Sequence, residues 1–231
     1  MKVIILAAGL GSRLGKFTKS KPKSLIKIGG KSILQRLIDQ FISIGINDIS
    51  IICGYQKKKI LNEFPNLKCY YYPNYSKTNN LHTLYYFKKL LNNDCIISFA
   101  DIILERQILN NLSKSSKNIT LCVDKSKVRE GTMKIDILKN KLIYLGNNSK
   151  IESGNYIGVM KIKKKACKLI IKSMKNIIHK SKNYYFTESI NYIINKNIIP
   201  VHYQDVKKRF WTEIDDLNDL KIARKKFSRG K

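Results

Sequence analysis

A glycine-rich segment near the start of the chain carries residue types that are suited to phosphate chemistry. Gly9 and Gly11 lack Cβ atoms, so backbone N–H groups in this segment can converge on an anionic ligand. Arg13 adds a planar fork of donors that matches the oxygens of a phosphate. Lys23 follows Pro22 in the same segment and supplies a second cation. Together these residues predict an anion site of the kind that holds a phosphate group.

The spacing of the glycines does not by itself identify the ligand. Residues 9–14 lack the third glycine of the GxGxxG fingerprint of dinucleotide-binding proteins, and the sequence contains no GxxxxGK[ST] phosphate-binding loop. On spacing alone, a flexible glycine-rich turn without a ligand is an alternative.

The first half of the sequence predicts alternating strands and helices around this segment. Residues 2–6 are a short apolar run, the pattern of a strand buried on both faces, and residues 7–31 predict a long loop. Further strands are predicted at residues 48–52, 67–72 and 95–99. The helices between the strands are expected to begin at Ser32, after Gly54, and at Asn79 or Asn80. The alternation predicts a parallel α/β sheet, whose ligands bind at the carboxyl ends of the strands. Asp101, just after the fourth strand, is therefore expected at the same sheet edge as the glycine segment.

The second half predicts a different pattern. Short strands are expected at residues 118–123, 132–137, 141–144 and 156–161. Two helices near residues 164–178 and 186–194, a strand at 198–203 and a last helix are expected to follow. The last helix begins at Asp216 and has Asp219 at its third position, a variant of the capping box. We expect the short strands to form a small β-rich insertion within one domain.

The net charge of +29, from 45 basic and 16 acidic residues, first suggests a nucleic-acid partner. However, 38 of the basic residues are lysines spread over the whole chain, and only 7 are arginines, the better readers of guanine. Lysine, isoleucine and asparagine all have A/T-rich codons, so genome composition accounts for much of the charge. We therefore expect no nucleic-acid partner, while a non-catalytic RNA- or polyanion-binding module stays an alternative.

The sequence favours a cytoplasmic protein without a membrane span. Its apolar runs are far shorter than the roughly 20 residues that cross a bilayer, and the N-terminal segment lacks the features of a signal peptide. The five cysteines are scattered and form no CxxC pair, which is typical of a reducing compartment.

Residues 9–23 resemble the signature GxG[ST]R[LM]xPxTxxxPK of the nucleotidylyltransferases that act on sugar phosphates and related small phosphates. The match has one departure, because Lys16 stands where the family usually has proline. Gly54-Tyr55 resembles the GY of the same family. Two further segments, Asn79-Asn80 and WTEIDD at residues 211–216, are similar to the short bacterial choline-phosphate cytidylyltransferases within the MobA-like NTP transferase superfamily. The sequence lacks the hexapeptide repeats of the larger sugar nucleotidylyltransferases.

The resemblance covers nearly the whole chain and implies a Rossmann-like α/β/α sandwich with a mostly parallel central sheet. It implies a single nucleotidylyltransferase domain over residues 1–231, with a nucleotide-binding half (1–117) and an acceptor-binding half that includes the C-terminal helix (118–231). The implied reaction joins an NTP, with CTP preferred, to a small phosphate or phosphonate acceptor and releases pyrophosphate. Phosphocholine, phosphoethanolamine and 2-aminoethylphosphonate are acceptors of this type.

The resemblance also implies Mg²⁺ as cofactor, because both reactants are anions and charge neutralisation is the main catalytic problem. In the family, aspartates at the positions of Asp101 and Asp215 hold the metal. A helix or turn cap is the alternative for each, and Asp216 is a rival cap beside Asp215. Arg13 is expected to hold the β- and γ-phosphates, and Lys23 to stabilise the α-phosphate and the incoming phosphate. No general base is required, since a phosphate monoester has a second pKa of about 6.

The family further implies two sets of contacts. The nucleotide is expected to contact Leu6, Ala7, Ala8, Gly9, Gly11, Ser12, Arg13, Lys23, Gly54, Tyr55, Asn79 and Ala100. The acceptor is expected to contact Asn80, Tyr185, Glu188 and Trp211, because a choline head suits an aromatic cage or a carboxylate. The alternative for these aromatic residues is a place in the core.

Two other reactions are also compatible with the sequence. A sugar 1-phosphate acceptor would give an NDP-sugar, and molybdenum-cofactor nucleotidylation shares the glycine segment, although the EID ending speaks against it. A homodimer is compatible with the sequence.

Overall fold

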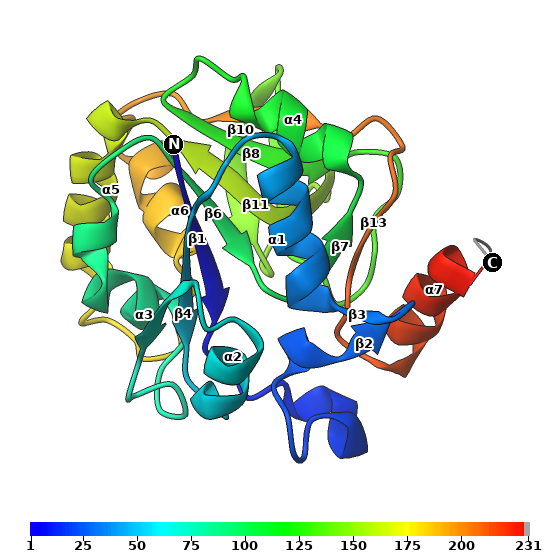
Figure 1. The fold of residues 1–231 in the computed structure, drawn as a ribbon. Helices are drawn as coiled ribbons and strands as arrows, with labels where there is room; N and C mark the ends of the chain where they lie inside the picture. Colours follow the sequence, from blue (N-terminus) through cyan, green and yellow to red (C-terminus); the bar gives the residue numbers. More distant parts are fainter. Residues whose placement is uncertain (229–231) are drawn as a thin grey trace.

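The computed structural model describes residues 1–228, and its first half builds the parallel part of a central sheet (Figure 1). The strands are β1 (Lys2–Ala7), β4 (Asp48–Cys53), β5 (Lys68–Tyr71) and β6 (Cys95–Phe99). They lie in the order β6-β1-β4-β5, and each neighbouring pair is parallel. β1 and β6 are apolar along nearly their whole length, as strands buried on both faces must be. All four strands lie where the sequence predicts them.

The strands of the second half continue the same sheet. They are β8 (Ile119–Asp124), β9 (Lys134–Leu138), β10 (Lys141–Gly146), β11 (Gly154–Ile162) and β12 (His202–Asp205). β11 runs antiparallel to β6 and also pairs with β8 and β9, so it joins the two halves. The α/β architecture with a mostly parallel core is confirmed, and the predicted β-rich segment is continuous with that sheet. β12 begins later than predicted, after Pro200, which has no N–H for a strand ladder.

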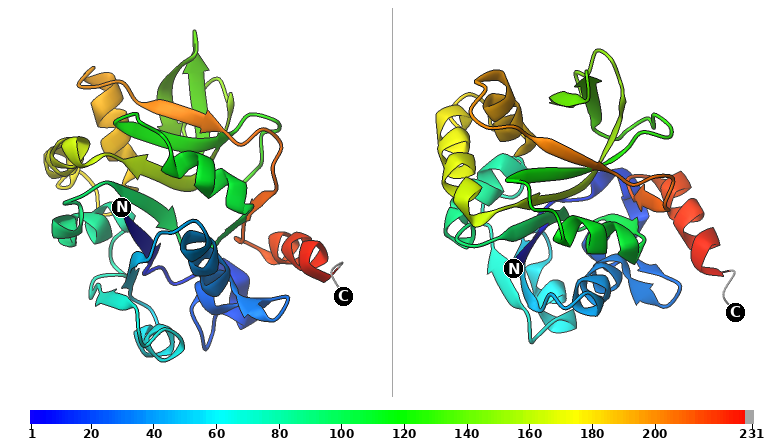
Figure 2. Two further views of the ribbon diagram at one scale, coloured as in Figure 1. Left: turned by 45° about the horizontal axis from the view of Figure 1, so that its top comes forward. Right: turned by 90° about the horizontal axis from the view of Figure 1, so that it is seen from above.

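Helices cover both faces of the sheet (Figure 2). One face carries α1 (Ile33–Ser43), α2 (Lys57–Glu63) and α4 (Arg106–Ser113) around one apolar cluster. The other face carries α3 (Asn80–Tyr86), α5 (Lys164–Ile177) and α6 (Thr187–Asn195) around a second cluster, with the short turn η3 (Lys88–Leu90) after α3. The predicted α/β/α sandwich is therefore confirmed. None of the helices within residues 1–228 is both long and apolar enough to cross a membrane.

Local signals place the helix ends as expected. The Ser32 hydroxyl accepts a hydrogen bond from the Gln35 backbone N–H at 3.1 Å and caps α1, and Gly45 adopts a positive φ of 80° just after the helix. Asp216 caps α7 (Leu217–Ser228), because its side chain accepts from the N–H groups of Asn218 and Asp219. The Asp219 carboxylate in turn accepts from the N–H of Asp216, which completes the reciprocal capping box.

Residues 7–31 are more ordered than the predicted long loop. They contain the 3₁₀ turns η1 (Ser12–Phe17) and η2 (Lys23–Leu25) and the strand β2 (Lys27–Ile28), which pairs with β3 (Lys31–Ser32). Buried apolar side chains of this segment, including Leu14 and Ile26, pack with Ile214 and with Leu220 of α7 in a third apolar cluster. The C-terminal helix thus holds the glycine segment in place.

A small two-stranded sheet links the fourth strand to the C-terminal segment. β7 (Ile102–Leu104) follows Asp101 and pairs antiparallel with β13 (Trp211–Glu213). This pairing places the EID segment beside the carboxyl end of β6, at the same edge of the sheet as the end of β1.

Candidate functional site

Asp101 and Asp215 lie next to each other although they are far apart in the sequence. Asp101 begins the turn into β7, and Asp215 follows β13. Beyond the strand pair, the backbone N–H of Ile214 donates to the Asp101 carbonyl at 2.9 Å and extends the contact by one residue. Both predicted metal ligands therefore stand at one place on the sheet edge.

Lys23 lies between these two carboxylates. Its Nζ is 2.6 Å from Asp101 Oδ2 and 2.8 Å from Asp215 Oδ1, and its side chain is 15% exposed. Burial alone would lower the pKa of Lys23, but the two carboxylates outweigh that effect and raise the pKa above its ordinary value. The ammonium is thus fully charged at neutral pH and occupies a position that a metal ion would also favour.

Arg13 reaches one of these carboxylates, that of Asp215, from the glycine segment. Its Nη2 is 3.0 Å from Asp215 Oδ1, while 65% of its side chain is exposed to the solvent. Because this ion pair is largely open to water, it is weak, and the guanidinium is free to turn toward an anionic ligand. The predicted set of two cations and two aspartates is assembled at one point.

Close packing in the glycine segment holds both cations in place. Gly11 has φ 65°, and a Cβ there would lie 2.8 Å from Lys23 Cβ, so only glycine fits. The Thr18 hydroxyl donates to the Gly11 carbonyl at 3.0 Å. The Tyr55 hydroxyl donates to the carbonyls of Thr18 at 3.1 Å and Lys19 at 2.7 Å. Tyr55 therefore braces the loop from outside.

Glu213 is a site residue that is not among the sequence-predicted contacts. A carboxylate oxygen of Glu213 lies within 4.8 Å of oxygens of both Asp101 and Asp215. Burial, and then the two neighbouring aspartates, raise the pKa of Glu213 well above its ordinary value. Its place in the EID triplet was a usable signal, because alternate residues of a short strand point to the same side and Glu213 is two residues from Asp215.

The carboxylates fit a divalent cation. Besides the three clustered acids, Asp101 Oδ1 is buried and has no hydrogen-bond partner within the described residues. A buried carboxylate oxygen without a partner is costly, and a hard cation with oxygen ligands would satisfy it. Asp101, Asp215 and Glu213 are therefore the residues that could hold Mg²⁺.

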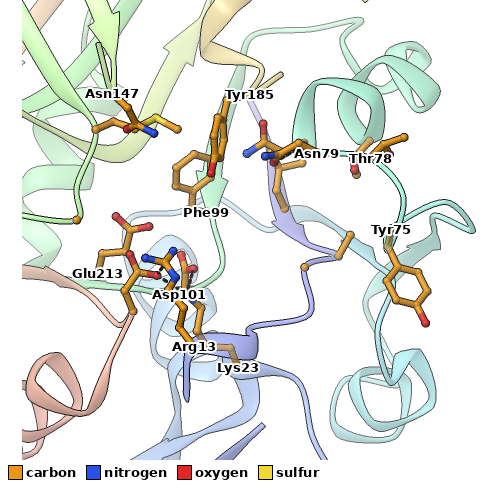
Figure 3. Close-up of a pocket in the computed structure, with 18 residues that line it drawn as sticks. Arg13, Lys23, Tyr75, Thr78, Asn79, Phe99, Asp101, Asn147, Tyr185 and Glu213 are labelled. Atoms are coloured by element: carbon orange, nitrogen blue, oxygen red, sulfur yellow. Dashed lines mark hydrogen bonds and ion pairs between the residues drawn. The ribbon is translucent and has the colours of Figure 1, made fainter. Parts of the chain in front are cut away.

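A cavity of about 470 Å³ opens above this cluster and continues into one of about 370 Å³ (Figure 3). Most predicted nucleotide contacts line one or both: Leu6, Ala7, Ala8, Gly9, Gly11, Ser12, Arg13, Lys23, Asn79 and Ala100. Figure 3 shows Tyr75, Thr78 and Asn79 at one end of the cavity, Asn147 at the other end, Phe99 and Tyr185 between these ends, and Arg13, Lys23 and Asp101 below them. The Asn79 end and the Asn147 end thus share one charged cluster.

Gly54 and Tyr55 shape this cavity from behind and are not among the residues that line it. A Cβ on Gly54 would lie 2.6 Å from the Ala8 carbonyl oxygen and 2.5 Å from Tyr75 Cβ. Gly54 is therefore needed for close packing of the end of β4 against the glycine segment. The positions of Gly54 and Tyr55 support a role in shaping the cavity and do not support the predicted direct contact with the nucleotide.

Asn79 and Asn80 connect the nucleotide end to the segment that precedes α6. The Asn79 side chain caps α3 and also donates to the Asn183 carbonyl at 3.2 Å. The Asn80 side-chain oxygen accepts from the Phe186 N–H at 2.7 Å. Tyr185, between these two contacts, lines the cavity, as does Asn80. Both predicted acceptor-side residues therefore reach the site.

Two predicted acceptor contacts are wrong. Trp211 is 1% exposed, and its indole N–H donates to Asp124 Oδ2 at 2.7 Å under the guanidinium of Arg129. Glu188 does not line the cavity, and its carboxylate accepts from the Asn191 side chain at 3.2 Å. The sequence could not show which way these side chains point, because both lie on elements with one buried face.

A stability effect follows from the position of Trp211. Trp211→Phe keeps an aromatic ring but removes the N–H bound to Asp124, so we expect a loss of about 1–3 kcal/mol in the free energy of unfolding. Burial raises the pKa of Asp124, but its hydrogen bonds from Ser126 and Trp211 outweigh this and lower the pKa overall. The stability tied to this ionisation is present above the unfolded-state pKa of about 3.9 and is lost as pH falls further.

Urea unfolding at pH 7 and at low pH measures this effect. The stability difference between Trp211→Phe and the wild type is expected to shrink toward acid pH. If Trp211→Phe leaves the stability unchanged but alters the KM of the acceptor, Trp211 contacts the acceptor and the structural role is wrong.

Comparison with known proteins agrees with this geometry. A family model described as the MobA-like NTP transferase domain matches residues 3–141. The chain is 28% identical to the CTP:phosphoglutamine cytidylyltransferase of Campylobacter jejuni, over 96% of this chain and 98% of that protein. It is 36% identical to the choline-phosphate cytidylyltransferase of Streptococcus pneumoniae over 50% of this chain and 52% of that protein.

The fold has a solved counterpart. The structure of a CTP:phosphocholine cytidylyltransferase from Streptococcus pneumoniae superposes with a TM-score of 0.81 at 24% identity, over 97% of each chain. At 24% identity this similarity shows that the two proteins share a fold, and it shows nothing beyond the fold.

Proposed function

The chain belongs to the MobA-like NTP transferase family, and from this premise we propose that it is a Mg²⁺-dependent cytidylyltransferase. The proposed reaction joins CTP to a small phosphate or phosphonate acceptor and releases pyrophosphate. The observation that carries this proposal is the cluster in which Lys23 bridges Asp101 and Asp215, with Arg13 beside it, on the floor of the cavity.

The charges of the cluster suit transfer between two anions. Arg13, exposed and held by one weak ion pair, is placed to turn toward the β- and γ-phosphates and the departing pyrophosphate. Lys23, buried and rigidly held, is placed to stabilise charge on the α-phosphate and the attacking oxygen. The attacking phosphate is already ionised near pH 7, so positioning and electrostatics suffice for the step.

Asp101, Asp215 and Glu213 would hold the metal ion, which when bound supplies positive charge to the phosphate oxygens. The Lys23 ammonium is also a cation between the two aspartates, so it neutralises their charge when no metal is present. Metal ligation requires the carboxylate form, so binding of a cation would favour the ionised form of Glu213.

The preference for CTP and for small acceptors is supported by the relatives. The two similar proteins carry names that specify cytidylyl transfer, to phosphoglutamine in one case and to choline phosphate in the other. A sugar 1-phosphate acceptor is the second candidate, and polyanion binding without catalysis is the candidate of another class. The intact charged cluster speaks against the last of these.

A matrix of four NTPs against a panel of phosphates and phosphonates tests the proposal. Pyrophosphate release is scored with Mg²⁺ and with a chelator. We expect turnover with CTP and a small acceptor that stops when the metal is removed. Turnover only with a sugar 1-phosphate would favour the second candidate. Nucleic-acid binding with a steep salt dependence and no pyrophosphate release would favour the third.

A further inference from the structure

The loop between β10 and β11, residues 147–153, contributes one residue to the larger cavity, opposite the nucleotide end. Asn147, its first residue, lines the larger cavity, and Figure 3 shows it at the opposite end from Asn79, with Phe99 and Tyr185 between them. The smaller cavity, which follows the glycine segment, does not include Asn147. Asn147 is therefore placed where the acceptor, and not the nucleotide, would bind.

Asp136 of β9 fixes this loop from within. Asp136 as a residue is 4% exposed, and its carboxylate accepts from the backbone N–H groups of Lys150, Ile151 and Glu152, each at 3.0 Å, and from the Ser149 hydroxyl. Burial raises the pKa of Asp136, but these donors outweigh it and lower the pKa overall. An ionised side chain that accepts hydrogen bonds from three successive backbone N–H groups restricts the conformation of the loop.

Asn191 of α6 fixes the chain on the other side of Asn147. Its side chain accepts from the Leu145 N–H at 2.9 Å and donates to the Leu145 carbonyl at 2.8 Å. Glu188, one helical turn earlier, accepts from the same amide and holds its orientation. The backbone is thus anchored two residues before Asn147 and again from Ser149 onward.

Resting on the proposed function, we propose that Asn147 recognises the head group of the acceptor and that Asp136 is the positioning residue that presents it. Asn147 is an exposed residue, and its side-chain amide can both donate and accept hydrogen bonds. A phosphate or phosphonate whose head group carries N–H, O–H or C=O groups can use it. A trimethylammonium head cannot, because it has neither a donor nor an acceptor.

The aromatic side chains of the cavity support the same conclusion. Among the described residues the rings that line it are Tyr75, Phe99 and Tyr185, and Figure 3 shows Tyr75 at the opposite end from Asn147. Trp211 is buried elsewhere. Phe99 packs edge-on against Tyr156 and Phe186 in the core. A complete aromatic cage around a quaternary ammonium is therefore not built from the described side chains, so hydrogen bonding determines the choice of acceptor.

Steady-state kinetics with CTP and four acceptors tests the proposal. The acceptors are phosphoethanolamine, 2-aminoethylphosphonate, phosphoglutamine and phosphocholine. For the wild type, we expect kcat/KM for phosphocholine to be at least about tenfold below that of the best hydrogen-bonding acceptor. Asn147→Ala is expected to raise the KM of that acceptor about tenfold, with the CTP KM changed less than about twofold. Asn148→Ala, at the neighbouring exposed position outside the cavity, is the matched control.

The role of Asp136 is tested by a double-mutant comparison. Asp136→Asn is expected to raise the acceptor KM in the wild-type background but to add almost nothing in the Asn147→Ala background. If Asp136→Asn does not fold, Ser149→Ala takes its place in this comparison, because it removes the hydroxyl that donates to the Asp136 carboxylate. An equal added effect in both backgrounds would overturn the positioning role.

Three other results would overturn the proposal. They are an acceptor KM that is unchanged in Asn147→Ala, an equal rise in the CTP KM, and phosphocholine as the best acceptor. If the wild type releases no pyrophosphate with any NTP and acceptor, the proposed function itself fails and this inference fails with it. Pyrophosphate release by the wild type therefore distinguishes failure of the proposed function from failure of the Asn147 proposal alone.

Discussion

Lys23→Ala is expected to lower kcat by at least about 100-fold, the scale for removal of one preorganised electrostatic stabiliser. The structure places the ammonium between Asp101 and Asp215 at distances of 2.6 and 2.8 Å, on the floor of the cavity. Its effect should appear in kcat more than in the CTP KM, because the charge it stabilises develops during the transfer.

Mg²⁺ dependence separates this role from a structural one. Lys23 competes with a metal ion for the same two carboxylates, so Lys23→Ala should not raise the Mg²⁺ concentration needed for half-maximal activity. Lys27→Ala, which removes an exposed lysine on β2, is the control and should retain activity. A loss of less than about tenfold in kcat for Lys23→Ala would refute its assignment to the transition state.

Asp101→Ala is expected to abolish Mg²⁺-dependent turnover. Asp101 contributes a buried oxygen without a partner among residues 1–228, and one of its carboxylate oxygens lies within 4.8 Å of oxygens of the other two acids, so it is the best-placed metal ligand of the cluster. Removal of its charge also leaves Lys23 with one carboxylate in place of two. Asp101→Asn keeps the shape of the side chain and should show the same loss, because a neutral amide is a poorer ligand for a hard cation.

Calorimetric titration with Mg²⁺ and pyrophosphate release measure this effect together. Asp48→Ala is the matched control, since Asp48 is exposed at the start of β4 and its ion pair with Lys68 lies at the surface. Unchanged activity and an unchanged Mg²⁺ response in Asp101→Ala would remove this residue from the metal site.

The sequence predicted the parts of the site that depend on local chemistry. Ser32 and Gly45 bound α1 because capping and positive φ are local requirements, and both are confirmed. Gly11 and Lys23 are adjacent in space because the segment that carries them is short and tightly packed. Asp101 was found from its place after a buried strand, since strand ends of a parallel sheet meet at one edge.

Features that depend on long-range pairing were not predictable in the same way. The β7–β13 pair brings Glu213 and Asp215 to Asp101, and no local pattern encodes which short strands will pair. The inward orientation of Trp211 and the attachment of Glu188 to Asn191 are set by tertiary packing. The regular structure within residues 7–31 depends on contacts with α7, so the local sequence could not predict it either.

A crystal structure with CTP, or a non-hydrolysable analogue, and Mg²⁺ tests the central claim most directly. We expect the triphosphate to lie over the glycine segment with Arg13 and Lys23 on its oxygens, and one Mg²⁺ to be held by Asp101 and Asp215. A triphosphate bound elsewhere, or an ion that touches neither aspartate, would contradict the assignment of this cluster to nucleotidyl transfer.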